Sequence, residues 1–149
     1  MMTAAVKRFS AVSVGPWPNL RTFSPAVRVG NLLFISGTTA TDERGEIVGR
    51  GDIVAQTRHI YRKFEQLLVA AGASLYDIVD TTEYVTTTRN YKGTAGVRRD
   101  LLGGPPYPAA TGVVVAGLLR EGALIEISAV AVLPAGRVTR RRRAPRGAP

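Results

Sequence analysis

Glu126 is the residue of this chain whose type and setting most clearly indicate chemistry, because it interrupts the apolar run from Leu124 to Ile127. An ionisable group in such a strand must point to solvent, find a partner or line a cavity. A carboxylate that lines a cavity can hold a water molecule and transfer a proton, which suits hydrolytic chemistry. The alternative is an ion pair between Glu126 and an arginine at an interface between subunits.

Hydroxyl groups form a second set of candidates. Ser36, Thr38 and Thr39, with Gly37 among them, follow an apolar segment, and Thr111 begins another one. These hydroxyls could donate or accept hydrogen bonds with a ligand. Threonine is also simply a favourable residue in a strand, so both interpretations stay open.

The motifs of the common enzyme classes are absent from the sequence. It contains no GxGxxG, P-loop, GxSxG or HExxH pattern. It has no cysteine, which excludes disulfides and thiolate zinc sites. The single histidine, His59, has the pattern of a partly exposed helix residue, and Asp42 with Glu43 that of a solvated turn. We therefore expect neither a cofactor nor a metal ion.

Two apolar runs around Glu126 must position its side chain. Residues 111–119 and 123–133 are rich in valine, isoleucine and alanine and are separated by a turn that contains Gly122. The pattern predicts two adjacent, mostly buried antiparallel strands. Upstream, the segments 26–29 and 32–36 flank Gly30-Asn31, which predicts a β-hairpin, and residues 37–41 then form a loop.

Two helices and one further strand are expected between these parts. Asp52 is a predicted N-cap, and apolar residues at spacings of three and four continue to Ala71 before Gly72. Residues 78–87 predict a strand, and residues 90–102 a weaker helix. The order of elements predicts one sheet with two helices on one face, an α+β sandwich.

The basic charge belongs mainly to the C-terminal end. Six arginines lie in the last thirteen residues, and without them the formal net charge falls from +9 to +3. Residues 135–149 are therefore expected to be a disordered basic tail. Such a tail could bind RNA by counterion release, but it lacks interleaved aromatic residues. No segment has the length of a membrane span or of a secretory core, so we expect a cytoplasmic protein without membrane contact.

Short motifs in a fixed order make the chain similar to the RidA/YjgF family of reactive-intermediate deaminases. The resemblance covers residues 23–134, after an N-terminal segment, residues 1–22, that holds a possible short strand at 9–14. The motifs are Phe23 to Val27, Gly30 to Gly37, Gln56, Gly72-Ala73 before Ile78-Val79, Tyr107 to Ala109, and Ile125 to Ile127 followed by Ala129 to Ala131.

The family implies a chorismate-mutase-like fold and a homotrimer with pockets in the clefts between subunits. It implies that a glutamate in the last strand, matched by Glu126, positions the water that releases ammonia from an imino acid. Backbone groups near a turn glycine, matched by Gly37, hold the substrate, and Phe23 takes a place often held by tyrosine. The candidate substrate-binding residues are Phe23, Ser36, Gly37, Thr38, Thr39, Arg98, Tyr107, Ala110, Thr111 and Gly112.

Two positions depart from the family pattern. Where the best-known members have an arginine that grips the substrate carboxylate, this chain has Ala110, and Thr38 replaces the usual polar residue after Ser-Gly. A methyl group provides neither the charge nor the bidentate geometry of a guanidinium. Three outcomes follow. The first is another substrate, which is neutral, aromatic or anchored by another arginine such as Arg98 or Arg99. The second is related ammonia-releasing chemistry on an enamine or hydroxylamino compound, and the third is a non-catalytic binding protein, which includes an RNA-associated one.

Overall fold

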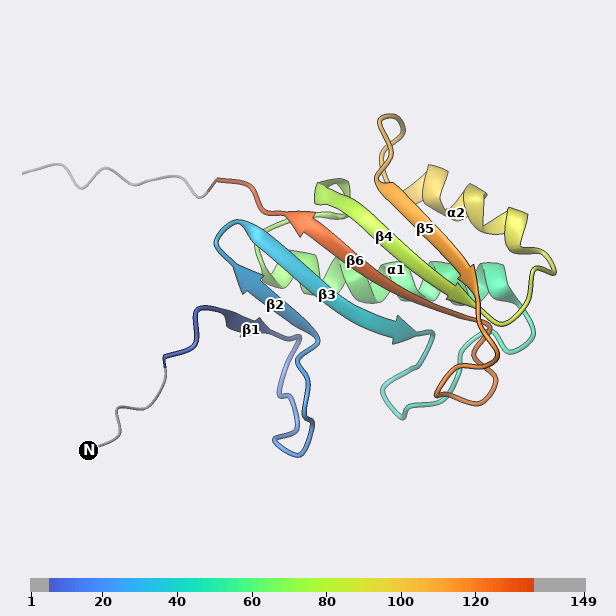
Figure 1. The fold of residues 1–149 in the computed structure, drawn as a ribbon, viewed down its shortest axis with the longest axis horizontal. Coiled ribbons are helices and arrows are strands. Elements are labelled where there is room, and N and C mark those ends of the chain that lie inside the picture. The colour runs from blue at the N-terminus through green and yellow to red at the C-terminus, as the bar shows by residue number, and fades with distance from the viewer. Residues whose placement is uncertain (1–5, 136–149) are drawn as a thin grey trace, which may run out of the picture.

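A six-stranded sheet forms the body of the protein (Figure 1). The computed structural model describes residues 6–135. The strands lie in the order β1-β2-β3-β6-β4-β5, and only β4 and β5 are parallel neighbours. Their bounds are β1 Ser10–Val12, β2 Ala26–Val29, β3 Leu32–Thr39, β4 Ile78–Val85, β5 Ala109–Val114 and β6 Ile125–Val132.

Both helices cover the same face of this sheet, as Figure 1 shows. Helix α1 spans Ile53–Ala70, and the Asp52 carboxylate caps it by accepting hydrogen bonds from the amides of Val54 and Ala55. Helix α2 spans Thr94–Leu101. Short 3-10 turns precede β4 at Leu75–Asp77 (η1) and α2 at Tyr91–Gly93 (η2). The predicted α+β sandwich is confirmed, together with the capped helix and the hairpin β2–β3.

The core fills the space between α1 and the sheet. Its largest members are fully buried and come from the inward faces of α1, β3 and β6, since alternate strand residues point to the same side. They are Leu33, Ile60, Tyr61, Phe64, Leu68, Ile125 and Ile127. This packing determines which residues of β6 remain on the other face.

The expected pairing of the last two apolar runs is wrong. β5 and β6 are not neighbours, because β4 lies between them. β5 pairs in parallel with β4 at the edge of the sheet, and all its residues are exposed. A parallel neighbour needs a crossover, which α2 provides between β4 and β5. Residues 115–124 form no strand, and this length of chain allows β6 to enter between β3 and β4.

The expected loop after Ser36 is also wrong, because β3 continues to Thr39. The pairing of β3 with β6 shifts register between Ile35 and Thr38, as in a β-bulge. An extra residue in one strand bends it and re-aims the side chains beyond it. Gly37 lies inside this irregular stretch, so it belongs to strand β3 and not to a loop.

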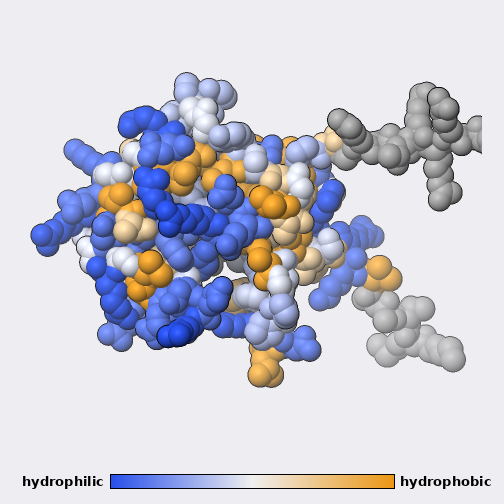
Figure 2. All heavy atoms as spheres, turned by 180° about the vertical axis from the view of Figure 1, so that it is seen from behind, coloured by the Kyte–Doolittle hydropathy of each residue, from blue (hydrophilic) through white to orange (hydrophobic). Residues whose placement is uncertain are grey.

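The two sides of the protein differ in polarity. Phe34, Tyr84, Val113 and Val132 are exposed on the face of the sheet that no helix covers. The helix-bearing side, seen in Figure 2, is covered mainly by hydrophilic residues. Among residues 6–135, no helix is long and apolar enough to cross a membrane. The predicted basic tail lies outside the described residues, except for Ala135.

Candidate active site

Glu126 projects from the uncovered face of the sheet. Its neighbours Ile125 and Ile127 are fully buried in the core, so the intervening side chain points the other way. The side chain is half-buried, and its carboxylate lies directly over Gly37 of β3. A Cβ atom placed on Gly37 would be only 2.6 Å from Glu126 Oε1. The structure thus brings together two residues that the sequence analysis selected separately.

A buried glutamine secures the chain just before Glu126. The Gln56 side chain on α1 donates hydrogen bonds to the carbonyl oxygens of Gly49 and Gly122, at 3.1 and 3.0 Å. Its Oε1 accepts a hydrogen bond of 2.8 Å from the backbone amide of Leu124. Because Gln56 is fully buried, these bonds exchange little with water. They anchor the chain at Leu124, two residues ahead of the carboxylate.

Lys63 holds the bulged end of β3 from the helix side. Its Nζ donates hydrogen bonds to Thr38 Oγ1 at 2.7 Å, to the Thr39 carbonyl at 2.9 Å and to Thr41 Oγ1 at 2.9 Å. Burial lowers the pKa of Lys63, and the nearby charge of Arg120 lowers it further. Within the chain, Thr38 and Thr39 therefore act as acceptors for Lys63. The sequence analysis named both as candidate substrate-binding residues and, equally, as ordinary strand residues.

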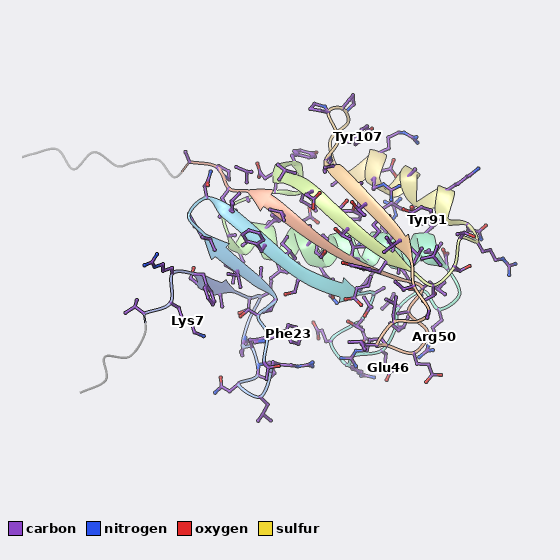
Figure 3. The ribbon with its side chains drawn as sticks, in the orientation of Figure 1. Lys7, Phe23, Glu46, Arg50, Tyr91 and Tyr107 are labelled. Carbon is purple, nitrogen blue, oxygen red and sulfur yellow. The ribbon has the colours of Figure 1, made fainter. Side chains whose placement is uncertain are left out.

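Ser36 ties the N-terminal segment to β3. Its Oγ donates to the Ser24 carbonyl at 2.6 Å, and its amide donates to the Pro25 carbonyl at 2.9 Å. The adjoining Phe23 is half-exposed, and its ring makes an edge contact with Trp17 at 5.5 Å between centroids. Phe23 lies on a loop beside β1 and β2 (Figure 3). Ser36 thus positions this aromatic loop through its own hydroxyl.

The remaining candidates gather at the opposite edge of the sheet. Ala110 of β5 lies beside Thr81 of β4, and both line a pocket of about 210 Å³ between β5 and α2. Arg98 and Tyr107 line the same pocket. Figure 3 shows Tyr107 beyond the β5 edge, far from Phe23. Within one protomer, the pocket and the Glu126 carboxylate lie on opposite faces of the sheet.

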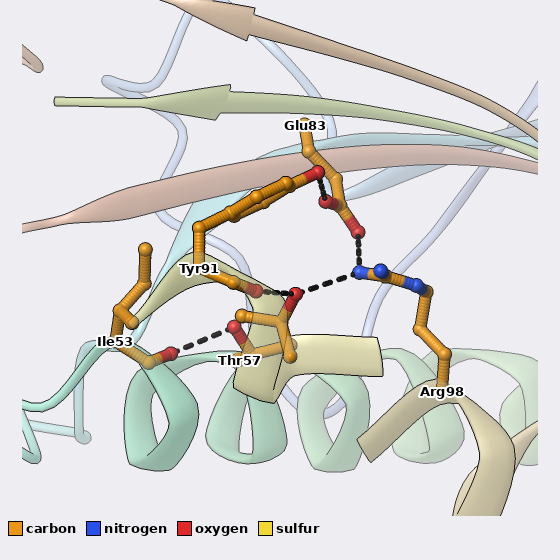
Figure 4. Close-up of polar contacts among 6 residues, drawn as sticks. Ile53, Thr57, Glu83, Tyr91 and Arg98 are labelled. Atoms are coloured by element: carbon orange, nitrogen blue, oxygen red, sulfur yellow. Dashed lines mark hydrogen bonds and ion pairs between the residues drawn. The ribbon is translucent and has the colours of Figure 1, made fainter. Parts of the chain in front are cut away.

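The fully buried carboxylate of the sheet belongs to Glu83, not to Glu126. Glu83 Oε2 accepts a hydrogen bond of 2.6 Å from the Tyr91 hydroxyl, and Oε1 lies 2.7 Å from Arg98 Nη1 (Figure 4). Burial raises the pKa of Tyr91, and the hydrogen bond to Glu83 raises it further. Arg98 also donates to Thr94 Oγ1 at 3.0 Å. Arg98 is therefore an ion-pair partner in the protein interior, and a ligand can reach only its remaining N–H groups.

The contact between Tyr91 and Glu83 explains why position 112 is a glycine. A Cβ atom at Gly112 would be 2.9 Å from the Tyr91 hydroxyl oxygen, so the glycine leaves the space through which Tyr91 reaches Glu83. Thr111, the next candidate, is exposed on the edge strand opposite Thr82. Sequence reasoning missed Glu83 because it fits the regular alternation of this strand and so does not stand out. The same alternation was the available signal, since it places Glu83 on the core face together with Thr81 and Val85.

The described part of the chain offers no site for a metal ion: residues 6–135 contain no cluster of three histidine, cysteine, aspartate or glutamate side chains suited to one. His59 Nε2 lies 3.1 Å from the Thr41 carbonyl oxygen, which occupies this ring nitrogen. The chemistry of the site must therefore be argued from Glu126, the backbone beside Gly37 and the arginines at the β5 edge.

The family model described as endoribonuclease L-PSP matches residues 17–133, nearly the whole described region. The chain belongs to the RidA/YjgF family. It is 32% identical to the 3-aminoacrylate deaminase RutC of Acinetobacter baylyi over 117 residues, which cover 78% of this chain and 91% of RutC. It is 37% identical to a RutC family protein of Pyrococcus horikoshii over 110 residues, which cover 73% and 85% of the two chains.

Solved structures of this family share the fold of the chain. A Rid family protein from Yersinia pestis superposes with a TM-score of 0.75 at 28% identity, covering 84% of this chain and 99% of that one. RidA from an Antarctic Psychrobacter superposes with a TM-score of 0.73 at 29% identity, with coverage of 83% and 99%. Membership of the RidA/YjgF family and the expected fold are therefore confirmed.

Proposed function

We propose that this RidA/YjgF member is an enzyme that uses Glu126 to hold a water molecule for the release of ammonia from a small imine, enamine or hydroxylamino compound. The observation that carries the proposal is the contact between the Glu126 carboxylate and Gly37. It places a proton acceptor over a glycine backbone on an uncovered sheet face. The related protein named 3-aminoacrylate deaminase supports ammonia release as the reaction class.

The chemistry needs one proton acceptor and one water molecule. For a protonated imine, Glu126 takes a proton from water as the oxygen bonds to the carbon and the C=N π electrons move to nitrogen. The protonated Glu126 then returns this proton to the amino nitrogen of the carbinolamine. As the C–N bond breaks and ammonia leaves, the Glu126 carboxylate takes the hydroxyl proton, which leaves a carbonyl compound, and this proton then passes to ammonia or solvent.

The standard 2-imino acid is not the proposed substrate, because position 110 is alanine. The methyl group of Ala110 cannot form the bidentate contact that a guanidinium makes with a carboxylate. Ala110 lies in a pocket that contains other arginines, so a different anchoring arrangement is available at that edge of the sheet.

Self-association as a homotrimer is part of the proposal. The uncovered face carries exposed apolar residues such as Phe34, Tyr84 and Val132, as interfaces between subunits do. Phe23 and Ala110 lie at opposite edges of one sheet, so a pocket that uses both needs two protomers. Analytical ultracentrifugation tests this directly, and a monomer at micromolar concentration would contradict it.

The decisive experiment compares ammonia release by the parent protein and by Glu126→Gln, with 2-iminobutanoate and enamine substrates generated in situ. We expect the substitution to abolish turnover while the assembly state and the melting temperature are retained. Glu121→Gln is the matched control, because Glu121 is an exposed carboxylate in the turn before β6. Unchanged turnover in Glu126→Gln would remove the proposed role.

The substitution Ala110→Arg separates the substrate question from the catalytic one. If the parent protein is inactive on 2-iminobutanoate and Ala110→Arg is active, the missing guanidinium explains the altered specificity. Rapid turnover of 2-iminobutanoate by the parent would contradict the proposed specificity. In the non-catalytic alternative, neither the parent nor Ala110→Arg releases ammonia. In its RNA-associated form, the parent protein binds RNA, and deletion of residues 135–149 abolishes that binding.

A further inference from the structure

One face of helix α1 holds both strands that meet where the Glu126 carboxylate lies over Gly37. Gln56 anchors the chain just ahead of β6, through its bond to the Leu124 amide. About two helical turns later on the same helix, Lys63 reaches the end of β3. Residues seven apart lie on the same side of a helix, so both side chains approach the sheet from the side opposite the carboxylate.

The Lys63 ammonium is fully satisfied by oxygens from one short stretch of chain. They are Thr38 Oγ1, the Thr39 carbonyl oxygen and Thr41 Oγ1, at 2.7, 2.9 and 2.9 Å from Nζ. A lysine ammonium has three N–H donors, and each has an acceptor here. The three bonds therefore fix residues 38–41 relative to α1.

Charge pairing does not explain the place of Lys63. The side chain is half-buried, and Lys63 takes part in none of the ion pairs among residues 6–135. Burial lowers its pKa, and the nearby cation of Arg120 lowers it further. A partly buried cation without a carboxylate partner is costly, so its three neutral oxygens must offset that cost.

The stretch that Lys63 holds lies directly beside Glu126. Thr39 is the residue opposite Glu126 in the pairing of β3 with β6, and Gly37 precedes it by two residues. The register of this pairing shifts between Ile35 and Thr38. At such a bulge the regular ladder is disrupted, so bonds from outside the sheet help to fix the strand. Lys63 supplies these bonds from α1.

We propose that Lys63 is a positioning residue of the candidate active site, which holds residues 38–41 so that the Glu126 carboxylate stays over Gly37. The role is indirect, because Lys63 acts from the helix side and the carboxylate lies on the uncovered face. In so far as it concerns the rate of ammonia release, the inference rests on the proposed function. The position of the carboxylate can be measured without that reaction.

The first test is ammonia release by Lys63→Met, which nearly keeps the length of the side chain and removes its three donors. We expect kcat to fall about tenfold and KM to change less than about twofold, because a reacting group is displaced. Arg62→Met is the matched control, since it removes an exposed cation from the neighbouring position of α1 and should keep the parent kcat. Parent kcat in Lys63→Met would overturn the proposal.

Thr41 offers a second test that changes no charge and does not depend on the folding of Lys63→Met. Thr41→Val removes one acceptor of Lys63 and should lower kcat about threefold. Thr41→Ser keeps a hydroxyl group at this position and should retain the parent kcat. Equal kcat values in the two variants would overturn the proposal.

The carboxylate itself provides a readout that needs no turnover. In protein labelled with ¹³C at the glutamate carboxyl groups, the NMR signal of Glu126 is the one that Glu126→Gln removes. It should shift in Lys63→Met and in Thr41→Val, and it should stay in place in Arg62→Met and in Thr41→Ser. An unmoved signal in Lys63→Met would overturn the proposal.

This inference and the proposed function can fail separately. If Glu126→Gln releases ammonia at the parent rate, the catalytic role of Glu126 falls, and its carboxyl signal then decides whether Lys63 positions it. If Glu126→Gln is inactive while Lys63→Met has the parent kcat and an unmoved carboxyl signal, the catalytic proposal stands and the role of Lys63 falls.

Discussion

Replacing Gly37 by alanine tests the contact on which the catalytic proposal depends. The backbone at Gly37 has no positive φ, so alanine fits its conformation without strain. The added methyl group would instead meet the carboxylate, at 2.6 Å from Glu126 Oε1. Because the obstructing atom is the end of a flexible side chain, the carboxylate must move and the strand can stay in place.

The structure gives the size of this displacement. A methyl carbon and an oxygen come into ordinary contact near 3.4 Å, so the carboxylate must withdraw by about 0.8 Å. A misplacement of about 1 Å in a reacting group can cost ~100-fold in rate. We therefore expect kcat for ammonia release to fall by roughly tenfold to 100-fold in Gly37→Ala, with KM changed much less.

The assay couples ammonia release to a second enzyme, and urea unfolding reports stability alongside it. Gly96→Ala is the matched control, since within residues 6–135 no atom other than those of the flanking residues and of the helix backbone lies within 4 Å of a Cβ atom added at Gly96 in α2. It should stabilise the protein by up to about 1 kcal/mol and keep the parent kcat. Full activity in Gly37→Ala would refute the view that the carboxylate acts from its position over residue 37.

Three further predictions follow from the buried network and from the two faces of the sheet. Arg98→Met leaves Glu83 buried without its cation and should lower the free energy of unfolding by about 3–5 kcal/mol in urea titrations. The double variant Arg98→Met with Glu83→Gln should recover part of this loss. Additive effects of the two substitutions would contradict the pairing. The pKa of Tyr91 is raised in the folded state, so its contribution to stability is complete below pH 10 and is lost as the pH rises through the raised pKa. Unfolding at pH 9 and pH 11 should show a smaller alkaline loss in Tyr91→Phe than in the parent, whereas equal losses would disagree with this assignment. Finally, if the Glu126 face and the β5-edge pocket of two different protomers form one site, mixed assemblies of Glu126→Gln and Arg99→Gln chains should regain part of the activity that each homogeneous variant loses. No regain on mixing would exclude a shared site.

Local patterns in the sequence were sufficient for most elements of the fold. The Asp52 cap, the apolar spacing to Ala71 and the turn at Gly72 predicted α1, and Gly30-Asn31 predicted the hairpin. These signals are local, because hydrogen bonds and backbone conformations within a few residues produce them. The family motifs then indicated the RidA/YjgF family, which the comparison with known proteins confirms.

The strand order could not be read in this way. The two apolar runs after Tyr107 suggested a hairpin, yet β6 lies between β3 and β4, with β4 separating it from β5. Which strands become neighbours depends on contacts between residues distant in sequence, and apolar composition alone does not encode them. The same limit affected Gly37, whose place in β3 depends on a register shift opposite β6.

The sequence alone determined that an acidic residue, Glu126, interrupts the last apolar strand and that position 110 lacks an arginine. Only the tertiary structure decided what surrounds them. It put Glu126 over Gly37 on the uncovered face, and it put Ala110 beside Thr81 and the arginines of α2 on the other. It also showed that Glu83, unremarked in the sequence, is the carboxylate enclosed in the core, with Arg98 as its partner. The physical reason is that residue type limits what a side chain can do, whereas its environment is made by residues that the fold brings together from separate parts of the chain.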